Sequence, residues 1–207
     1  MSRRAGAIPE DTRAALLASA TEEFAEYGFE KASLRRICTK AGVTTGALYF
    51  LFQDKEDLFR SVISPVTDRI LVLIAEHYET ELASPLQSVL QGEDEDVRAG
   101  HEVLSLFYAH RTVCDVVLSN RSHPAVCAFF DSLIEKMDRQ MVLLLTQAHP
   151  AVAQHPAFNQ WTIHWISHML IDSVLHIIKH NFEEEQAKQQ LQILVRFLRG
   201  GFLALLP

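Results

Sequence analysis

The sequence has 207 residues, of which 48% are hydrophobic, and a formal net charge of −7 at neutral pH. This hydrophobic content excludes a disordered chain, and the length allows one large domain or two small ones with a sizeable core. Three scattered cysteines form no CxxC pair or disulfide framework, and no apolar run is typical of a signal peptide or a membrane span. We therefore expect a cytoplasmic protein without a membrane partner and, since long alternating stretches are lacking, an all-helical fold.

The charge is unevenly distributed along the chain. Residues 1–60 contain nine basic and nine acidic side chains, whereas residues 61–207 contain 10 basic and 17 acidic ones. Between positions 33 and 55 there are four basic side chains and one acidic side chain. A phosphate contact depends on this local field, so an acidic protein can still bind nucleic acid through its N-terminal part.

The N-terminal part predicts a run of short helices. Apolar residues recur at helical spacing from about Pro9 to Tyr27, and Gly28 follows as the terminating residue. A second helix is expected after Ser33, a good N-cap, and it ends at Gly42, where a tight turn needs a residue that tolerates positive φ.

A third helix is expected from Thr44, as its N-cap, to about Leu51. Two short helices joined by a glycine-containing turn are a helix-turn-helix, whose second helix enters the major groove of DNA. Asp54 then caps a fourth helix with an acidic first turn, and Pro65 predicts a kink or break near residues 61–65.

Beyond this region the sequence pattern is helical throughout, but it carries no comparable functional motif. Further helices are expected at about 97–109, 112–118, 124–147, 157–180 and 183–206, after a possible helix start at Ser84. The last two are long and apolar, and they favour a four-helix dimer interface over packing inside the monomer.

The segment from Gly42 to Leu58, GVTTGALYFLFQDKEDL, closely resembles the helix-turn-helix signature of the TetR family of repressors, and Phe24, Gly28 and Ser33 fit the same pattern. The resemblance implies an N-terminal three-helix DNA-binding domain at residues 1–60. It also implies a larger ligand-binding and dimerisation domain at residues 61–207, with about nine helices in all. The implied function is a ligand-responsive transcriptional repressor. It would bind near-palindromic double-stranded DNA as a homodimer through its last two helices, and a small-molecule inducer would release it.

The resemblance also assigns DNA-contacting roles to matching positions. Phosphate contacts are implied for Tyr49 and Lys55, and base-edge contacts for Ala47 and Phe50. The full predicted set is Ser33, Arg35, Arg36, Thr44, Thr45, Gly46, Ala47, Tyr49, Phe50 and Lys55. The family often has a histidine where this chain has Leu51, and the recognition helix lacks Arg, Lys, Asn and Gln. Direct base reading is therefore expected to be sparse, with DNA shape or bound water sharing the discrimination.

No motif marks a ligand pocket in the second part of the chain. The candidates for its walls are Phe107, His110, Cys114, Phe130, Trp161, Trp165, His168 and Asp172. The apolar residues among them could equally belong to the hydrophobic core. His164 and His168 have the i, i+4 spacing that can hold a metal, but a polar stripe or an interface explains them better. We therefore predict no metal and no cofactor.

Two other classes of protein were weighed against the repressor. An enzyme is not expected, because no GxSxG, P-loop, HExxH or dinucleotide-binding pattern occurs. A helical ligand- or metal-binding protein that has lost DNA binding is the stronger alternative.

Overall fold

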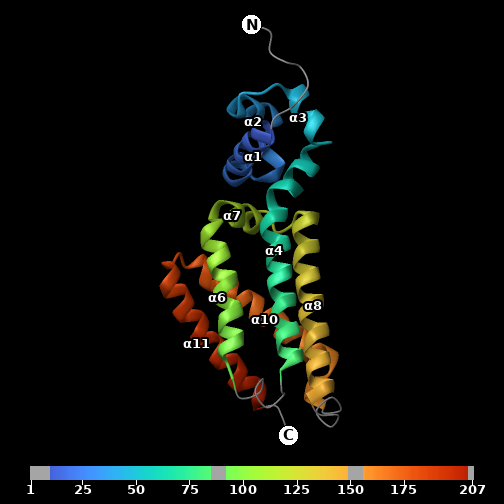
Figure 1. Ribbon diagram of the computed structural model, residues 1–207, viewed down its shortest axis with the longest axis vertical. Helices are drawn as coiled ribbons and strands as arrows, with labels where there is room; N and C mark the ends of the chain where they lie inside the picture. The colour runs from blue at the N-terminus through green and yellow to red at the C-terminus, as the bar shows by residue number, and fades with distance from the viewer. Residues whose placement is uncertain (1–9, 85–91, 149–155, 205–207) are drawn as a thin grey trace. The chain divides into compact units, whose positions relative to one another are not determined.

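The computed structural model describes residues 10–84, 92–148 and 156–204. Within these ranges the chain forms α-helices joined by turns and one short 3-10 helix (Figure 1). In chain order they are α1 (Glu10–Lys31), α2 (Leu34–Ala41), α3 (Thr45–Leu51), α4 (Lys55–Ala83), α6 (Asp94–Ala109), α7 (Arg111–Ser119), α8 (Pro124–Ala148), η1 (Pro156–Phe158), α10 (Gln160–Lys179) and α11 (Glu184–Leu203). The expected all-helical fold is confirmed for this part of the chain, and none of its helices is long and apolar enough to cross a bilayer.

The helices form two compact units. Unit 1 contains the described residues up to Arg69 together with His110–Ala128, and unit 2 contains Ile70–Ala109 and the described residues from Phe129 onward. α4 therefore begins in unit 1 and ends in unit 2, and α7 belongs to unit 1 although it follows α6 directly in the chain. The functional boundary expected after residue 60 stays a prediction.

Unit 1 is organised around a cluster of aromatic rings. α1 packs against α2 and α7, and α2 packs against α3. Phe24 is fully buried, and its ring meets that of Phe59 edge-on at 5.1 Å, the same centroid separation as between Phe29 and Phe59. Other buried members of this core are Leu16, Ala20, Ile37, Leu48, Phe52, Leu58 and Val62. The apolar faces of α1, α2, α3 and the first part of α4 are thus covered by one another.

Unit 2 holds α6 against α11 through both packing and polar contacts. Leu191 on α11 is 1% exposed and lies so close to Gly100 on α6 that a side chain at position 100 would touch it. Ser105 donates a hydrogen bond to Glu184 at 2.8 Å, and the hydroxyl of Tyr108 donates one to the carbonyl oxygen of Phe182 at 2.6 Å. α10 packs against α11 and η1.

Three expected helix boundaries differ from the observed ones. Gly28 interrupts the helix with φ 71° and ψ 169°, as expected, but helical structure resumes and α1 ends at Lys31. Of the kink or break expected near Pro65, the break does not occur: α4 continues through the proline as one helix, and the kink stays a prediction. α10 starts at Gln160 instead of position 157, since Asn159 accepts hydrogen bonds from the backbone N–H groups of Trp161 and Thr162 and caps the helix there. The helix start expected at Ser84 lies next to residues 85–91, outside the described ranges.

Candidate nucleic-acid interface

The turn between α2 and α3 has the geometry that the sequence predicts. Ser33 caps α2 by accepting a hydrogen bond from the backbone N–H of Arg36. Gly42 ends α2 in the left-handed conformation, at φ 69° and ψ 27°, and its N–H and that of Val43 return to carbonyl groups of the last turn. Thr44 then caps α3 by accepting from the N–H of Ala47 at 3.2 Å. The two helices are therefore fixed by local hydrogen bonds, and α3 starts at a defined residue.

α3 separates one buried side chain from an exposed aromatic pair. Leu48 is fully buried and anchors the helix to the core of unit 1. Tyr49 is 57% exposed and Phe50 is 75% exposed. Thr45 and Gly46 are also exposed, so the N-terminal end of α3 is accessible to a partner. Large aromatic side chains left in water on a short, well-anchored helix indicate a binding surface, because their burial would be favourable.

Basic side chains near α3 divide between exposed and internally bonded ones. Arg35 on α2 is exposed, and within the described residues its side chain forms no ion pair. Arg36, by contrast, forms an ion pair with Glu23, donates to the carbonyl oxygen of Lys31 at 3.0 Å, and lies over the ring of Tyr27. The structure thus gives Arg36 a role in holding α2 to α1, and its predicted DNA contact stays a prediction.

Lys55 also makes contacts inside unit 1. Its Nζ donates to the carbonyl oxygen of Glu30 at 3.1 Å and lies 4.8 Å from the centre of the Phe29 ring. These contacts hold the positive charge at the first residue of α4. An ammonium group has three N–H donors, so the bond to Glu30 leaves donors for a phosphate.

Glu23 is a positioning residue that the sequence reading missed. Its carboxylate is buried, accepts from the backbone N–H of Ser33 at 2.8 Å, and pairs with the guanidinium of Arg36. Burial alone would raise the pKa of Glu23, but the bonds from Arg36 and Ser33 outweigh it and lower the pKa. A glutamate ten residues before a helix cap gives no local sequence signal, because the contact exists only once α1 and α2 have packed.

A second missed contact ties α7 to α1. The side chain of Asn120, at the end of α7, is buried, accepts from the backbone N–H of Phe29 at 2.8 Å, and donates to the carbonyl oxygen of Val116. His123 lies between the rings of Phe29 and Phe59, at 4.3 Å from each. Its Nδ1 accepts from the backbone N–H of residue 125, and its Nε2 lies 3.0 Å from a carboxylate oxygen of Glu56. The segment after α6 is therefore hydrogen-bonded to α1 and packed against Phe59 of α4 within unit 1.

The eight residues predicted to line an inducer pocket do not lie together. Phe107 and Phe130 are buried in unit 2, whereas Cys114 is buried in α7 of unit 1 and His110 is exposed at the start of that helix. The other four point outward on one exposed face of α10, namely Trp161, Trp165, His168 and Asp172. The buried side of α10 carries other residues, among them Ile163 and Ser167. The structure does not gather these residues into one wall, and the pocket stays a prediction.

The paired histidines on α10 do meet, as their spacing implies. The Nε2 atoms of His164 and His168 are 3.2 Å apart. Asp138 on α8 lies 2.8 Å from Nδ1 of His164 and also accepts a bond from Ser167. Both rings are at least partly exposed.

Comparison with known proteins shows which sequences the N-terminal part of the chain resembles. Residues 16–62 match the sequence model of the family described as bacterial regulatory proteins, tetR family. Over 61 residues the chain is 46% identical to the HTH-type transcriptional repressor BepR of Brucella suis, a match that covers 30% of this chain and 29% of that protein. Over 92 residues it is 34% identical to the A-factor receptor protein of Streptomyces griseus, covering 44% of this chain and 30% of that protein. The matched segments thus span less than a third of either relative.

Solved structures extend the similarity to the whole chain at the level of the fold. A TetR-like transcriptional regulator from Rhodococcus sp. RHA1 superposes with a TM-score of 0.67 over 96% of this chain and 99% of its own, at 18% identity. SmeT, the repressor of the Stenotrophomonas maltophilia multidrug efflux pump SmeDEF, superposes with a TM-score of 0.64 over 93% of this chain and 92% of its own, at 20% identity. The sequence match is thus confined to the N-terminal part of the chain, where residues 16–62 match the tetR family, and the solved structures show that the chain shares the helical fold of TetR-like regulators.

Proposed function

We propose that this protein is a transcriptional repressor that binds double-stranded DNA as a homodimer and is released by a small-molecule inducer. The observation that carries the proposal is the exposed pair Tyr49 and Phe50 on α3, a helix capped at Thr44 and anchored by Leu48. A relative and a structural neighbour named as repressors, BepR and SmeT, support it. The match to a family of regulatory proteins also agrees with the expectation that the chain is not an enzyme.

In this proposal α3 lies in the major groove. Phe50 and Ala47 touch base edges, where thymine methyl groups offer apolar contacts, and Tyr49 bonds to a phosphate. Arg35 supplies a further cation, and Lys55 binds phosphate with donors that Glu30 leaves available. Because α3 carries two aromatic groups and no bidentate polar side chain, affinity rests on phosphate contacts more than on base reading.

The dimer is proposed to form through α10 and α11 of two copies. Within the described chain, Trp161 and Trp165 on α10 are 82% and 58% exposed, and Ile193 and Phe197 on α11 are 63% and 75% exposed. Aromatic and aliphatic side chains exposed to this extent on two neighbouring helices fit an isologous interface, in which each copy covers the face of the other. A two-fold dimer would place two copies of α3 on the two halves of a near-palindromic operator.

Inducer binding is proposed to act on unit 1 through two helices: α4, which continues into unit 1, and α7, which is part of it. α4 runs without interruption from unit 2 into unit 1, and α7 follows α6 directly. The bond from Phe29 to Asn120 then passes a displacement of α7 to the end of α1. The role of Pro65 as a lever stays a prediction: an unchanged inducer response in Pro65→Ala would remove Pro65 from this route.

The experiment is a gel-shift titration across a series of salt concentrations, with fragments selected by the purified protein from a pool of genomic DNA. Tyr49→Ala and Lys55→Ala should each weaken binding. Lys55→Ala should also reduce the slope of log K against log salt by about one, because one phosphate contact is lost. Phe50→Ala should leave the slope unchanged and relax sequence preference.

The matched control for Lys55 is Lys136→Ala, which removes one exposed charge from α8 in unit 2 and should leave the slope unaltered. Circular dichroism of each variant confirms that unit 1 remains folded. Undiminished binding in both Tyr49→Ala and Lys55→Ala, or failure to select any sequence, would reject the proposed function.

A further inference from the structure

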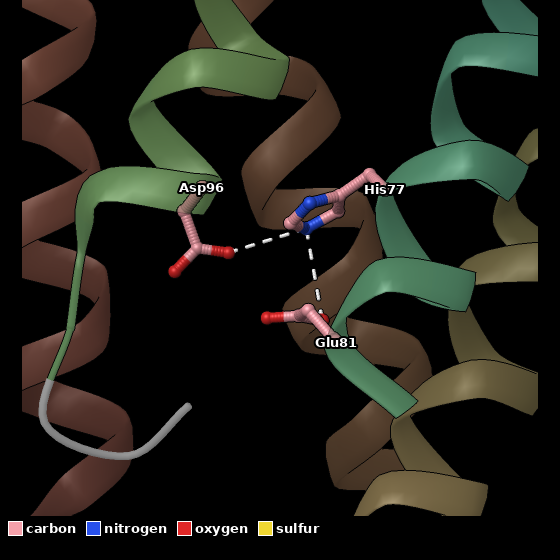
Figure 2. A group of neighbouring side chains, drawn as sticks. All are labelled: His77, Glu81 and Asp96. Atoms are coloured by element: carbon pink, nitrogen blue, oxygen red, sulfur yellow. Dashed lines mark ion pairs between the residues drawn. The ribbon is translucent and has the colours of Figure 1, made fainter. Parts of the chain in front are cut away.

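Unit 2 contains a buried group of ionisable side chains that DNA binding does not use. His77 and Glu81 lie one turn apart near the end of α4, and Asp96 reaches toward them from the first turn of α6 (Figure 2). The side chains of His77 and Glu81 are 9% and 8% exposed, and that of Asp96 is 23% exposed. This group, named here the α4–α6 cluster, joins two helices that are separated in the chain by residues 84–93.

We propose that the α4–α6 cluster binds a divalent transition-metal ion of the Zn²⁺ class. Nε2 of His77 lies 3.3 Å from Oδ1 of Asp96 and 3.6 Å from Oε2 of Glu81, and the three candidate ligand atoms all lie within 4.8 Å of one another. Zn²⁺ bonds to nitrogen and oxygen at about 2.0–2.2 Å, so ligands in a tetrahedral shell stand about 3.3–3.6 Å apart. The observed spacing needs little adjustment to accept such an ion.

The orientation of His77 supports a ligand at its Nε2 edge. Its Nδ1 is buried and has no hydrogen-bond partner among the described residues, so the ring is held through Nε2 alone. Figure 2 shows this edge directed at both carboxylates. One Nε2 proton can satisfy only one of two acceptors, whereas a metal ion can bond to the nitrogen and both oxygens at once.

The charges of the cluster point the same way. Two carboxylates are held close together in a mostly buried place, and a dication would offset their repulsion.

Arg199 on α11 completes the set as an orienting residue. Its Nη1 pairs with Oδ2 of Asp96, which leaves Oδ1 facing His77. Carboxylates that bind a metal are usually held in this way by a second partner. The cluster therefore offers one nitrogen and two oxygens, with the fourth position open to water or to a ligand. A bound ion would cross-link α4 to α6 whether or not unit 1 binds DNA.

The test uses full-length protein treated with EDTA, dialysed, and titrated with Co²⁺ and with Zn²⁺. Binding of Co²⁺ is followed by its visible absorption, Zn²⁺ by calorimetry, and unfolding by circular dichroism. We expect one tight ion per chain and a higher melting temperature with Zn²⁺. His77→Gln and Glu81→Gln, which preserve side-chain size, should weaken binding by at least about tenfold and abolish the rise in melting temperature.

The matched control is His168→Gln, because His164 and His168 on α10 bring two ring nitrogens within 3.2 Å of each other and could compete for the ion. This variant should keep the Co²⁺ spectrum and the stabilisation. Three outcomes would overturn the proposal: no binding by the wild type, binding unchanged in folded His77→Gln and Glu81→Gln, or binding lost in His168→Gln. The last two would place the ion elsewhere, and the first would leave the cluster as an ion-pair network.

Discussion

Unit 1 and unit 2 are built from similar amphipathic helices, but they differ in what they bury. Unit 1 buries rings, with Phe24, Phe29 and Phe59 in mutual contact. Unit 2 adds partly buried polar contacts, such as Ser167 to Asp138 and Tyr108 to the carbonyl oxygen of Phe182, and it buries the ionisable pair His77 and Glu81. The first kind of core holds helices that present side chains outward to a partner. The second leaves ionisable groups inside the protein, where they can respond to an ion or a ligand.

The largest expected effect tests whether the two cores are independent. Phe24→Ala removes a fully buried ring and should destabilise unit 1 by about 3–5 kcal/mol. Both tryptophans, Trp161 and Trp165, lie in unit 2. Unfolding followed by circular dichroism should therefore show an earlier transition in this variant, while tryptophan fluorescence should keep its midpoint.

The reciprocal variant is Phe107→Ala, which removes a buried ring from unit 2 and should shift the fluorescence midpoint. If Phe24→Ala shifts the circular dichroism and fluorescence transitions together, the two units unfold as one, and their different cores do not give them separate stabilities.

The same contrast explains what the sequence could predict. In unit 1 the caps at Ser33 and Thr44 and the left-handed Gly42 are set by neighbours in the chain, so residue types located α2 and α3, and the family resemblance indicated which side chains of α3 face outward. The contacts of Glu23 and Asn120 were missed because each joins residues distant in sequence. Such pairings follow from tertiary packing, which local spacing does not encode.

In unit 2 periodicity predicted the helices but not which face each one buries. On α11, Leu191 and Val195 are buried inside the unit, while Ile193 and Phe197 are exposed. A helix that is apolar around most of its circumference gives no signal for choosing between these faces. The α4–α6 cluster was missed for a related reason, since Asp96 follows His77 by 19 positions.

The proposed dimer is the next largest effect. Phe197→Glu places a charge on a face that we expect a second copy to cover, and interface aromatic residues commonly contribute about 2–4 kcal/mol. Sedimentation should show a dimer for the wild type and a concentration-dependent shift toward monomer for the variant. Val72→Glu, at another exposed apolar position of unit 2, should stay dimeric. A variant at position 197 that sediments like the wild type would place the interface elsewhere.

A smaller effect is expected at the buried carboxylate of unit 1. Glu23→Gln should lower stability at neutral pH by about 1–3 kcal/mol, because it removes a buried charged partner of Arg36. The folded-state pKa of Glu23 is lowered, so its stabilisation is present above the ordinary value of 4.5 and is lost as pH falls through the folded-state pKa. The difference between wild type and variant should therefore shrink in acid.

The neighbouring Glu22 provides the control for Glu23. It pairs with Lys40, but both side chains are more than half exposed, so Glu22→Gln should cost less than about 1 kcal/mol. Chemical denaturation of both variants at neutral and acid pH gives the comparison. Equal losses for the two substitutions, or a Glu23→Gln loss that does not vary with pH, would mean that burial does not strengthen the Glu23 pair.

The smallest effect concerns the close approach of α6 and α11 in unit 2. A Cβ at Gly100 would lie 2.4 Å from Cδ2 and 3.3 Å from Cγ of Leu191. Gly100→Ala gains about 1 kcal/mol of helix propensity, but the clash with a buried leucine costs about 1–3 kcal/mol, so a slight net loss is expected. In a Leu191→Ala background the clash is absent, and the same substitution should become stabilising. A double-mutant cycle measured by denaturation tests this reversal of sign. Without the reversal, the helices can separate enough to admit a methyl group, and the α6–α11 contact is looser than the polar bonds beside it imply.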